Sequence, residues 1–246
     1  MLEILYRDDA FVVVNKPSGL VVHRSRWAAD RDNCLVRLRD QLGQHVHPVH
    51  RLDRGTSGAL VFALSREHAR RLFDAFAARE IEKEYVAIVR GFAPDAGTID
   101  HPLSVEHAGP AAEARTCFRR VALVELPLPV GRYPTARFSF VVAEPLTGRT
   151  HQLRRHFAHI SHPILGDVNH GDGRQNRFFR ERFELNRLAL HASRIRFEHP
   201  LTRERIEAVA PLPAAFAEVV RALGWEPMLT PLFGLPSRSE LPDAQG

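Results

Sequence analysis

The feature that most constrains the fold is a run of six uncharged, mostly bulky residues, 59–64, that follows a glycine-containing turn. A short apolar run bounded by turn residues is typical of a buried strand, although its periodicity alone also permits a helix. The segment before it, His50-Arg51-Leu52-Asp53-Arg54-Gly55-Thr56-Ser57-Gly58, is then expected to form a loop at the edge of that strand. This interpretation puts one carboxylate, Asp53, at the end of a buried element.

Asp53 lies between two arginines and close in sequence to His50. The positive potential of Arg51 and Arg54 favours the ionised carboxylate, which could serve as a nucleophile or a base. The alternative is ordinary, because aspartate commonly stabilises turns and arginine commonly pairs with aspartate on protein surfaces. The segment alone leaves both interpretations open.

With 246 residues the chain can bury one large core or divide into two, and its apolar content of 44% is ordinary for a folded, soluble protein. The first nine residues lack the basic and apolar regions of an export signal, and no apolar run approaches a membrane span. We therefore expect a cytoplasmic protein. The two cysteines, Cys34 and Cys117, lie far apart and indicate neither a disulfide framework nor a thiolate metal site.

The charge balance is mildly basic, with a formal net charge of +5 and an isoelectric point of about 9.8. This bias fits a nucleic-acid partner but also suits many enzymes that act on small molecules. Of the 34 cationic residues only Lys16 and Lys83 are lysine, and both fall in stretches that look like motifs, 15–19 and 83–85.

The hydrophobic pattern predicts one α+β unit with a mostly antiparallel sheet, because strands follow strands more often than they alternate with helices. Strands are expected at residues 4–6, 11–14, 59–64, 85–89, 115–125, 136–142, 188–198 and 204–210. Helices are expected at 34–42, at 66–80, from a cap at Thr150 to Pro163, and at 214–223. The Gly-, Asp- and Arg-rich stretch 170–177 is interpreted as a loop, and the Pro-containing stretch from Trp225 onward as a loosely held tail.

The helix at 66–80 has a clear apolar stripe. Its apolar residues recur at i, i+3, i+4 and i+7, and Ser65 is placed to cap it. One face is therefore expected to pack against the core while the other carries arginines. The residues predicted to pack are Ala69, Leu72, Phe73 and Phe76.

Three ordered motifs resemble the RluA family of pseudouridine synthases. They are the H-R-L-D-x-x-T-S-G segment at 50–58, a K-x-Y-x-A-x-V-x-G segment at 83–91 and a G-R-T-H-Q-L-R segment at 148–154. Asn15-Lys16-Pro17-Ser18-Gly19 and Leu188-Ala189-Leu190-His191-Ala192 fit as well. The resemblance covers residues 4–224 in the right order, and five ordered matches are far more specific than any one of them.

The resemblance implies the isomerisation of a uridine inside an RNA chain, with Asp53 as the catalytic aspartate acting as nucleophile or base. Arg154 matches the arginine that pairs with this aspartate, and such a pair favours the ionised carboxylate and fixes its direction. Tyr85 resembles the aromatic residue that packs on the target base. The reaction exchanges no electrons and activates no water, so no metal or other cofactor is expected.

The same resemblance implies the substrate contacts. A paired base has to leave the stack before it can react, and Arg51 is similar to the residue proposed to fill the gap. Leu188 and Leu190 are expected to line the pocket. The remaining expected substrate contacts are His50, Lys16 and Arg149.

Segments 1–6, 22–25, 43–46 and 131–135 extend the likeness and imply a tRNA substrate modified at uridine 65, with a ribosomal RNA uridine as the sibling alternative. No membrane partner and no obligatory protein partner are inferred. We expect one catalytic domain at residues 1–224, without a small N-terminal RNA-binding domain, followed by the tail 225–246.

Two rival functions remain open. A metal-dependent hydrolase could use the histidines at 151, 156, 159 and 162 or at 45, 47 and 50, although no carboxylate lies between residues 151 and 162. A non-catalytic RNA-binding protein is the second rival. The basic run Arg174, Arg177, Arg180 and Arg182 suits either phosphate contacts or a solvated helix face.

Overall fold

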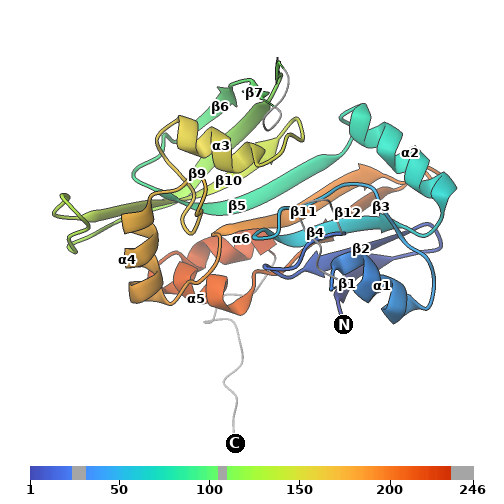
Figure 1. Ribbon diagram of the computed structural model, residues 1–246, viewed down its shortest axis with the longest axis horizontal. Coiled ribbons are helices and arrows are strands. Elements are labelled where there is room, and N and C mark those ends of the chain that lie inside the picture. The colour runs from blue at the N-terminus through green and yellow to red at the C-terminus, as the bar shows by residue number, and fades with distance from the viewer. Residues whose placement is uncertain (24–31, 105–109, 234–246) are drawn as a thin grey trace, which may run out of the picture.

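A ten-stranded sheet forms the centre of the computed structural model, which describes residues 1–23, 32–104 and 110–233 (Figure 1). Along the main path the order is β1-β2-β4-β11-β5-β10-β9-β6, with β12 paired to β11 and β3 to β4. The strands are β1 Glu3–Arg7, β2 Phe11–Lys16, β3 His47–Pro48, β4 Ser57–Ala63, β5 Glu82–Arg90, β6 Ala96–Asp100, β9 Arg115–Leu126, β10 Ala136–Pro145, β11 Leu190–Glu198 and β12 Arg205–Val209. A separate two-stranded sheet joins β7 Leu103–Ser104 to β8 Ala111–Ala112. The predicted α+β fold with a mostly antiparallel sheet is confirmed.

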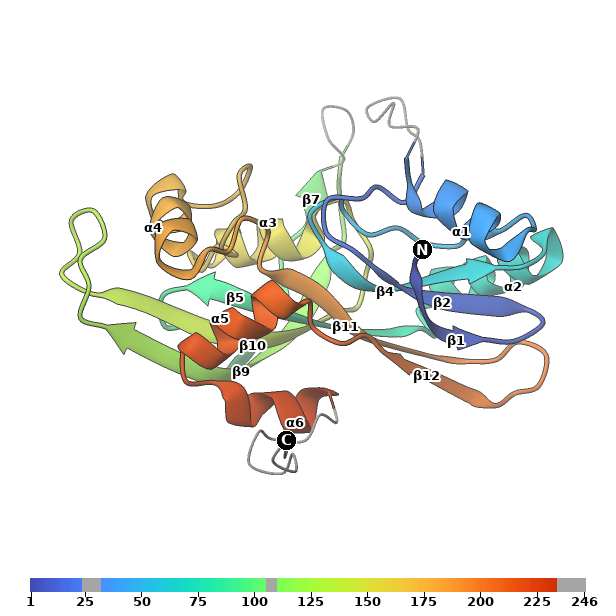
Figure 2. The same ribbon diagram turned by 90° about the horizontal axis from the view of Figure 1, so that it is seen from below.

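Helices cover the sheet and lie along its ends (Figures 1 and 2). They are α1 Cys34–Leu42, α2 Arg66–Ala77, α3 Gln152–His159, α4 Gly173–Phe183, α5 Ala214–Ala222 and α6 Leu229–Phe233, with a short 3₁₀ turn at Glu226–Met228. The predicted bounds of α1 are correct because both signals are local: the Asn33 side chain accepts from the Val36 N–H, and Gly43 ends the helix at φ +66°. Within the described ranges, no helix combines the length and apolar character needed to cross a membrane.

The central pairing is parallel. β4 lies beside β11, with Ser57 opposite His191 and Gly58 opposite Ala192. Gly58 has φ +114°, and a Cβ there would lie 2.1 Å from the carbonyl oxygen of Ala192. Only glycine fits this contact, so the Ser-Gly that ends the first motif serves to join the two halves of the sheet.

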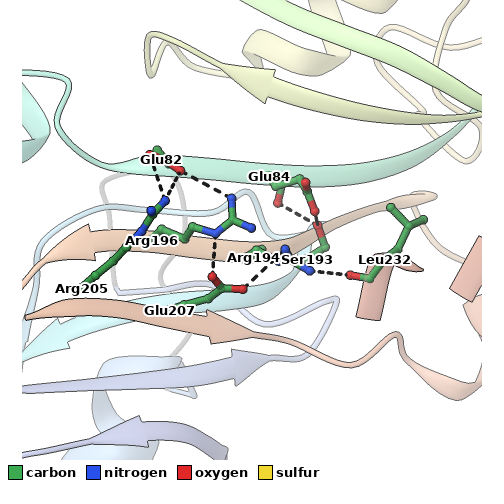
Figure 3. A network of polar contacts seen from close by, with 8 residues as sticks. All are labelled: Glu82, Glu84, Ser193, Arg194, Arg196, Arg205, Glu207 and Leu232. Atoms are coloured by element: carbon green, nitrogen blue, oxygen red, sulfur yellow. Dashed lines mark hydrogen bonds and ion pairs between the residues drawn. The ribbon is translucent and has the colours of Figure 1, made fainter. Parts of the chain in front are cut away.

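Ion pairs connect the neighbouring strands β5, β11 and β12 on one face of the sheet (Figure 3). Arg196 of β11 donates to Glu207 of β12 at 2.8 Å and to Glu82 of β5 at 3.5 Å, and Arg205 also reaches Glu82. These side chains are partly exposed, so each pair contributes about 1 kcal/mol or less. Their main effect is to favour one register of three adjacent strands.

Three local expectations are wrong. The stretch 173–177, expected as loop, begins helix α4, because the Asp172 carboxylate accepts from the N–H groups of Arg174 and Gln175 and Phe179 packs in the core. Helix α3 begins after His151, at φ +53°, rather than at a Thr150 cap. The chain after Trp225 is not loose up to residue 233, because its apolar side chains are buried; these are Trp225, Leu229, Leu232 and Phe233.

Helix α2 also departs from its prediction. Leu72 is fully buried, but Phe73 is 64% exposed. Helix α2 lies over the sheet with only one narrow strip in contact with it, so the predicted stripe is wider than the buried face. Phe73 instead faces a cavity described below.

Candidate active site

The turn at residues 15–19 supports the loop that carries Asp53. The Lys16 ammonium is fully buried and donates to the carbonyls of Pro17, Leu20 and Arg54 at 2.9, 2.6 and 3.3 Å. Gly19 donates its N–H to the Arg54 carbonyl at 2.7 Å, and a serine hydroxyl of the same turn donates to the Gly55 carbonyl. Two segments flagged separately in the sequence therefore form one rigid unit.

The parallel strands β4 and β11 are joined by a buried polar chain. The Ser57 hydroxyl lies 2.7 Å from Nδ1 of His191, whose Nε2 lies 3.0 Å from the Ala210 carbonyl. Since Nε2 must donate to a carbonyl, Nδ1 accepts from the hydroxyl, and Arg187 donates to the same Ser57 oxygen at 2.7 Å. Burial lowers the pKa of His191 to about 4, so its ring is neutral at physiological pH.

Arg154 of α3 holds two carboxylates. Its Nη1 lies 3.3 Å from Oδ2 of Asp53, the contact expected from the sequence. Its Nε and Nη2 donate to the two oxygens of Asp167 at 2.7 and 2.8 Å, a bidentate pair with no exposed Asp167 side-chain surface. Burial by itself would raise the pKa of Asp167, but hydrogen bonds from Arg154 and from the backbone of residues 169 and 170 hold it below its ordinary value.

Tyr85 of β5 is buried close to Asp53. Burial first and the negative charge of Asp53 second raise the pKa of the Tyr85 phenol well above its ordinary value. The phenol is therefore neutral at physiological pH and presents an apolar ring with an O–H group.

Two cavities meet at the Asp53 loop. The first, about 530 Å³, lies between α2, β5 and the start of α3; the second, about 790 Å³, lies between the turn at 15–19 and the loop that precedes α4. Residues 51–53, 150, 151 and 154 line both. Asp53 retains 20% side-chain exposure, so its carboxylate is held by Arg154 yet open to a ligand.

The structure brings most of the predicted site residues to these cavities. Asp53, Tyr85, Arg154, Arg51, His50, Leu190 and Arg149 line the first, and Leu188 lines the second. Lys16, the remaining predicted substrate contact, lines neither cavity; its buried ammonium donates to three backbone carbonyls and holds the loop in place.

His50 is present in the cavity wall as a neutral ring. Its Nε2 accepts the Val61 N–H at 3.0 Å, and the ring stacks on Phe76 with centroids 4.8 Å apart. Burial first and the charge of Lys83 second lower the pKa of His50 to about 3.

The histidines around helix α3 form pairs and hydrogen bonds. His151 lies 3.1 Å from His170, His101 stacks on His159, and His156 contacts Thr116 and the His101 carbonyl. Among the residues that the structure describes, no group of three or more His, Cys, Asp or Glu side chains is placed to hold a metal ion. The basic run on α4 is exposed and lines neither cavity.

Sequence reasoning missed Asp167 and Gln152. Asp167 follows a glycine after an apolar run, with no local sign that it fixes an arginine 13 residues earlier. Gln152 is buried, accepts from the Thr147 hydroxyl and the Arg149 N–H, and donates to Thr116 and the Arg115 carbonyl. It stabilises the turn from which α3 begins, in place of the expected Thr150 cap.

A carboxylate, a guanidinium and a phenol thus lie at the wall of one cavity in a protein built on a mixed sheet. Comparison with known proteins identifies the class of protein. Residues 10–159 match the family model described as RNA pseudouridylate synthase, and the chain belongs to this family. It is an RNA pseudouridine synthase.

Curated relatives are similar over nearly the whole chain. A protein of Vibrio cholerae named tRNA pseudouridine synthase C is 47% identical over 93% of this chain and 98% of its own length. A protein of the same name from Salmonella typhi is 48% identical, over 93% and 92%. Among solved structures, human RNA Pseudouridylate Synthase Domain Containing 1 superposes with a TM-score of 0.69 at 28% identity, covering 87% of this chain and 84% of its own.

Proposed function

We propose that this chain converts a uridine of tRNA into pseudouridine and that Asp53 is the reacting group. One observation carries the proposal: a carboxylate from the loop before β4, fixed by Arg154 of α3, lies at the wall of a cavity that Tyr85 also lines. The relatives named tRNA pseudouridine synthase C support tRNA as the substrate class.

The proposed reaction is an internal rearrangement. The bond between N1 of uracil and C1′ of ribose breaks, the base rotates, and a bond from C5 to C1′ forms. The proton on C5 leaves, and N1 ends with one. Asp53 acts as nucleophile or base at the target nucleoside, and the contact with Arg154 fixes the direction of its carboxylate. Atoms and electrons balance without an external oxidant, reductant or activated water.

The neighbouring side chains supply binding and access. The neutral ring of Tyr85 packs on the uracil, with Leu190 completing an apolar wall. The target base has to leave its stack, which costs a few kcal/mol. Arg51 is exposed where the two cavities meet, so its planar cation can enter the vacated position and contact phosphates.

Uridine 65 is the proposed target, as the resemblance implies, and mapping of pseudouridine in RNA tests it. Purified protein is incubated with tRNA and ribosomal RNA transcripts, and modified positions are read by chemical labelling and primer extension. We expect modification at uridine 65 of tRNA and none in a transcript with cytidine at that position. Modification only of ribosomal RNA would contradict the tRNA assignment, and modification of neither RNA would contradict the proposed function.

A further inference from the structure

Phe73 is a large aromatic side chain that the fold leaves in solvent. It is 64% exposed on α2, at a position that the apolar stripe predicts to be buried. Single exposed apolar residues are common, but Phe73 lies with Phe76 and Ala77 at i, i+3 and i+4, and all three line the 530 Å³ cavity. The end of this cavity formed by α2 therefore has an aromatic edge.

A pair of stacked aromatic rings forms the cavity wall between α2 and the reacting loop. Phe76 stacks on His50 at an interplanar angle of 29°, and His50 precedes Asp53 by three residues. The bond from the Val61 N–H fixes the His50 ring in this position. Such a wall fits a flat ring lying beside the target nucleoside.

The rim of the same end carries an arginine in a position that normally suits glycine. Arg79 follows α2 at φ +63°, and its N–H donates to the Phe76 carbonyl while the Glu80 N–H donates to the Ala75 carbonyl, the pattern of a Schellman helix end. This conformation is unfavourable for an L side chain. The conformation directs a guanidinium to the cavity rim.

Arg79 is held by a weak partner. Its Nη2 lies 2.9 Å from a Glu113 carboxylate oxygen, and both side chains are about half exposed. The Glu113 carbonyl accepts from Nε of Arg149, which also lines the cavity. In an exposed ion pair of this kind, a phosphate can readily replace the carboxylate as the partner of the arginine.

The charged side chains that line the cavity favour an anionic ligand. Its described lining contains five cationic side chains and one carboxylate: Arg51, Arg79, Lys83, Arg149 and Arg154 against Asp53. Flat aromatic surface beside an excess of cations is the combination that binds single nucleotides of RNA. The cavity volume of about 530 Å³ lies in the ordinary range of small-molecule sites.

We propose that this end of the cavity is a second nucleotide subsite, in which Phe73 stacks on a base next to the target uridine and Arg79 binds a phosphate. The subsite rests on the proposed function, because it serves the same RNA. It would select substrates in which a neighbouring nucleotide is also unstacked.

The first test replaces Phe73. Phe73→Ala should weaken tRNA binding about tenfold, and raise the KM with little change in kcat at saturating RNA, while Phe73→Trp should keep both. The matched control is Phe92→Ala, since Phe92 is 37% exposed, packs against Arg137 and lines none of these cavities. Equal RNA affinity of Phe73→Ala and wild type would overturn the subsite, as would an equal loss in the control.

The second test replaces Arg79. Arg79→Gln should reduce the slope of log affinity against log salt by about 1. Arg203→Gln is the control, because Arg203 also has a positive φ, +65°, and pairs with an exposed carboxylate, Glu198, but lines none of these cavities. An unchanged slope in Arg79→Gln would contradict the phosphate contact.

An RNA series locates the stacked base. Each nucleotide flanking the target is replaced in turn by an abasic residue, and affinity is measured with wild type and Phe73→Ala. At one position the two losses should fail to add, because the abasic residue removes the base that Phe73 contacts. Additive losses at every position would overturn the stacking. Release of the C5 hydrogen by wild type is measured separately. If wild type releases none, the proposed function is refuted. If wild type is active but the losses are additive at every position, only the subsite is refuted.

Discussion

At the scale of single residues, Arg154 is shared by two carboxylates in different surroundings. Asp167 takes two hydrogen bonds and has no exposed side-chain surface, whereas Asp53 takes one longer contact and stays partly open. This asymmetry suits a division of roles in which Asp167 fixes the guanidinium and Asp53 remains accessible to the nucleoside.

Asp167→Asn is the residue-scale prediction. Loss of the buried charge should lower the free energy of unfolding by about 3 kcal/mol and reduce kcat about 100-fold through misplacement of Arg154, with RNA affinity unchanged. Denaturant unfolding, single-turnover kinetics and RNA binding measure the three effects. Glu198→Gln, which breaks an exposed ion pair, is the control and should change stability by less than about 1 kcal/mol.

The stability loss should depend on pH in one direction. Because the folded protein holds the pKa of Asp167 below its ordinary value, the ionised group stabilises the fold above pH ~3.9 and loses that effect as the pH falls through the folded pKa. The difference between wild type and Asp167→Asn should therefore shrink as the pH falls below about 4. A difference that grows toward acid pH would contradict this account of the pair.

At the scale of elements, the site depends on the junction of β4 with β11. The first motif ends in Ser57 and Gly58, and both are paired with residues of β11. The hydroxyl joins the His191 chain, and the glycine permits close approach of the backbones. The loop with Asp53 precedes this junction directly, so its position depends on the strand pairing.

Gly58→Ala should disrupt the junction. The added Cβ would meet the Ala192 backbone at 2.1 Å and impose an unfavourable φ, so we expect a loss of about 4 kcal/mol or failure to fold. Gly173→Ala is the control, since a Cβ there meets nothing within 4 Å and no positive φ is required. Thermal unfolding compares the two; similar melting temperatures would contradict the steric argument.

The sequence predicts elements with local signals and misses those without them. Helix α1 is correct at both ends because Asn33 and Gly43 lie at its own boundaries. Helix α4 is missed because its glycine and aspartate also suit a loop, and only the burial of Phe179 decides. Phe73 is misplaced because periodicity gives an apolar face but not how much of it the sheet covers.

Prediction of the candidate site from the sequence is limited in the same way, because its contacts join distant segments. The contact between Asp53 and Arg154, 101 residues apart, was expected only because whole motifs resembled a known family. The geometry follows from the order of strands, which sequence reasoning did not derive. Asp167 lies outside every motif and was found only in the structure.

At the scale of the whole molecule, the sheet collects distant segments at one place. The loop before β4, the strand β5 and the helix α3 supply Asp53, Tyr85 and Arg154, which line one cavity. Hydrogen bonds from the turn at 15–19 and from β11 support the loop and the start of β4. The two cavities that meet there are lined by more cations than carboxylates, which favours a polyanionic substrate.

If the Asp53 carboxylate performs the chemistry, its replacement should stop the release of the hydrogen at C5 of the target uridine. Transcribed tRNA labelled with tritium at C5 of uridine is mixed with excess wild type or Asp53→Asn, and RNA binding is measured in parallel. We predict release by wild type, at least about 1000-fold slower release by Asp53→Asn, and tRNA affinity within about twofold for both. Release by Asp53→Asn at the rate of wild type would contradict the account.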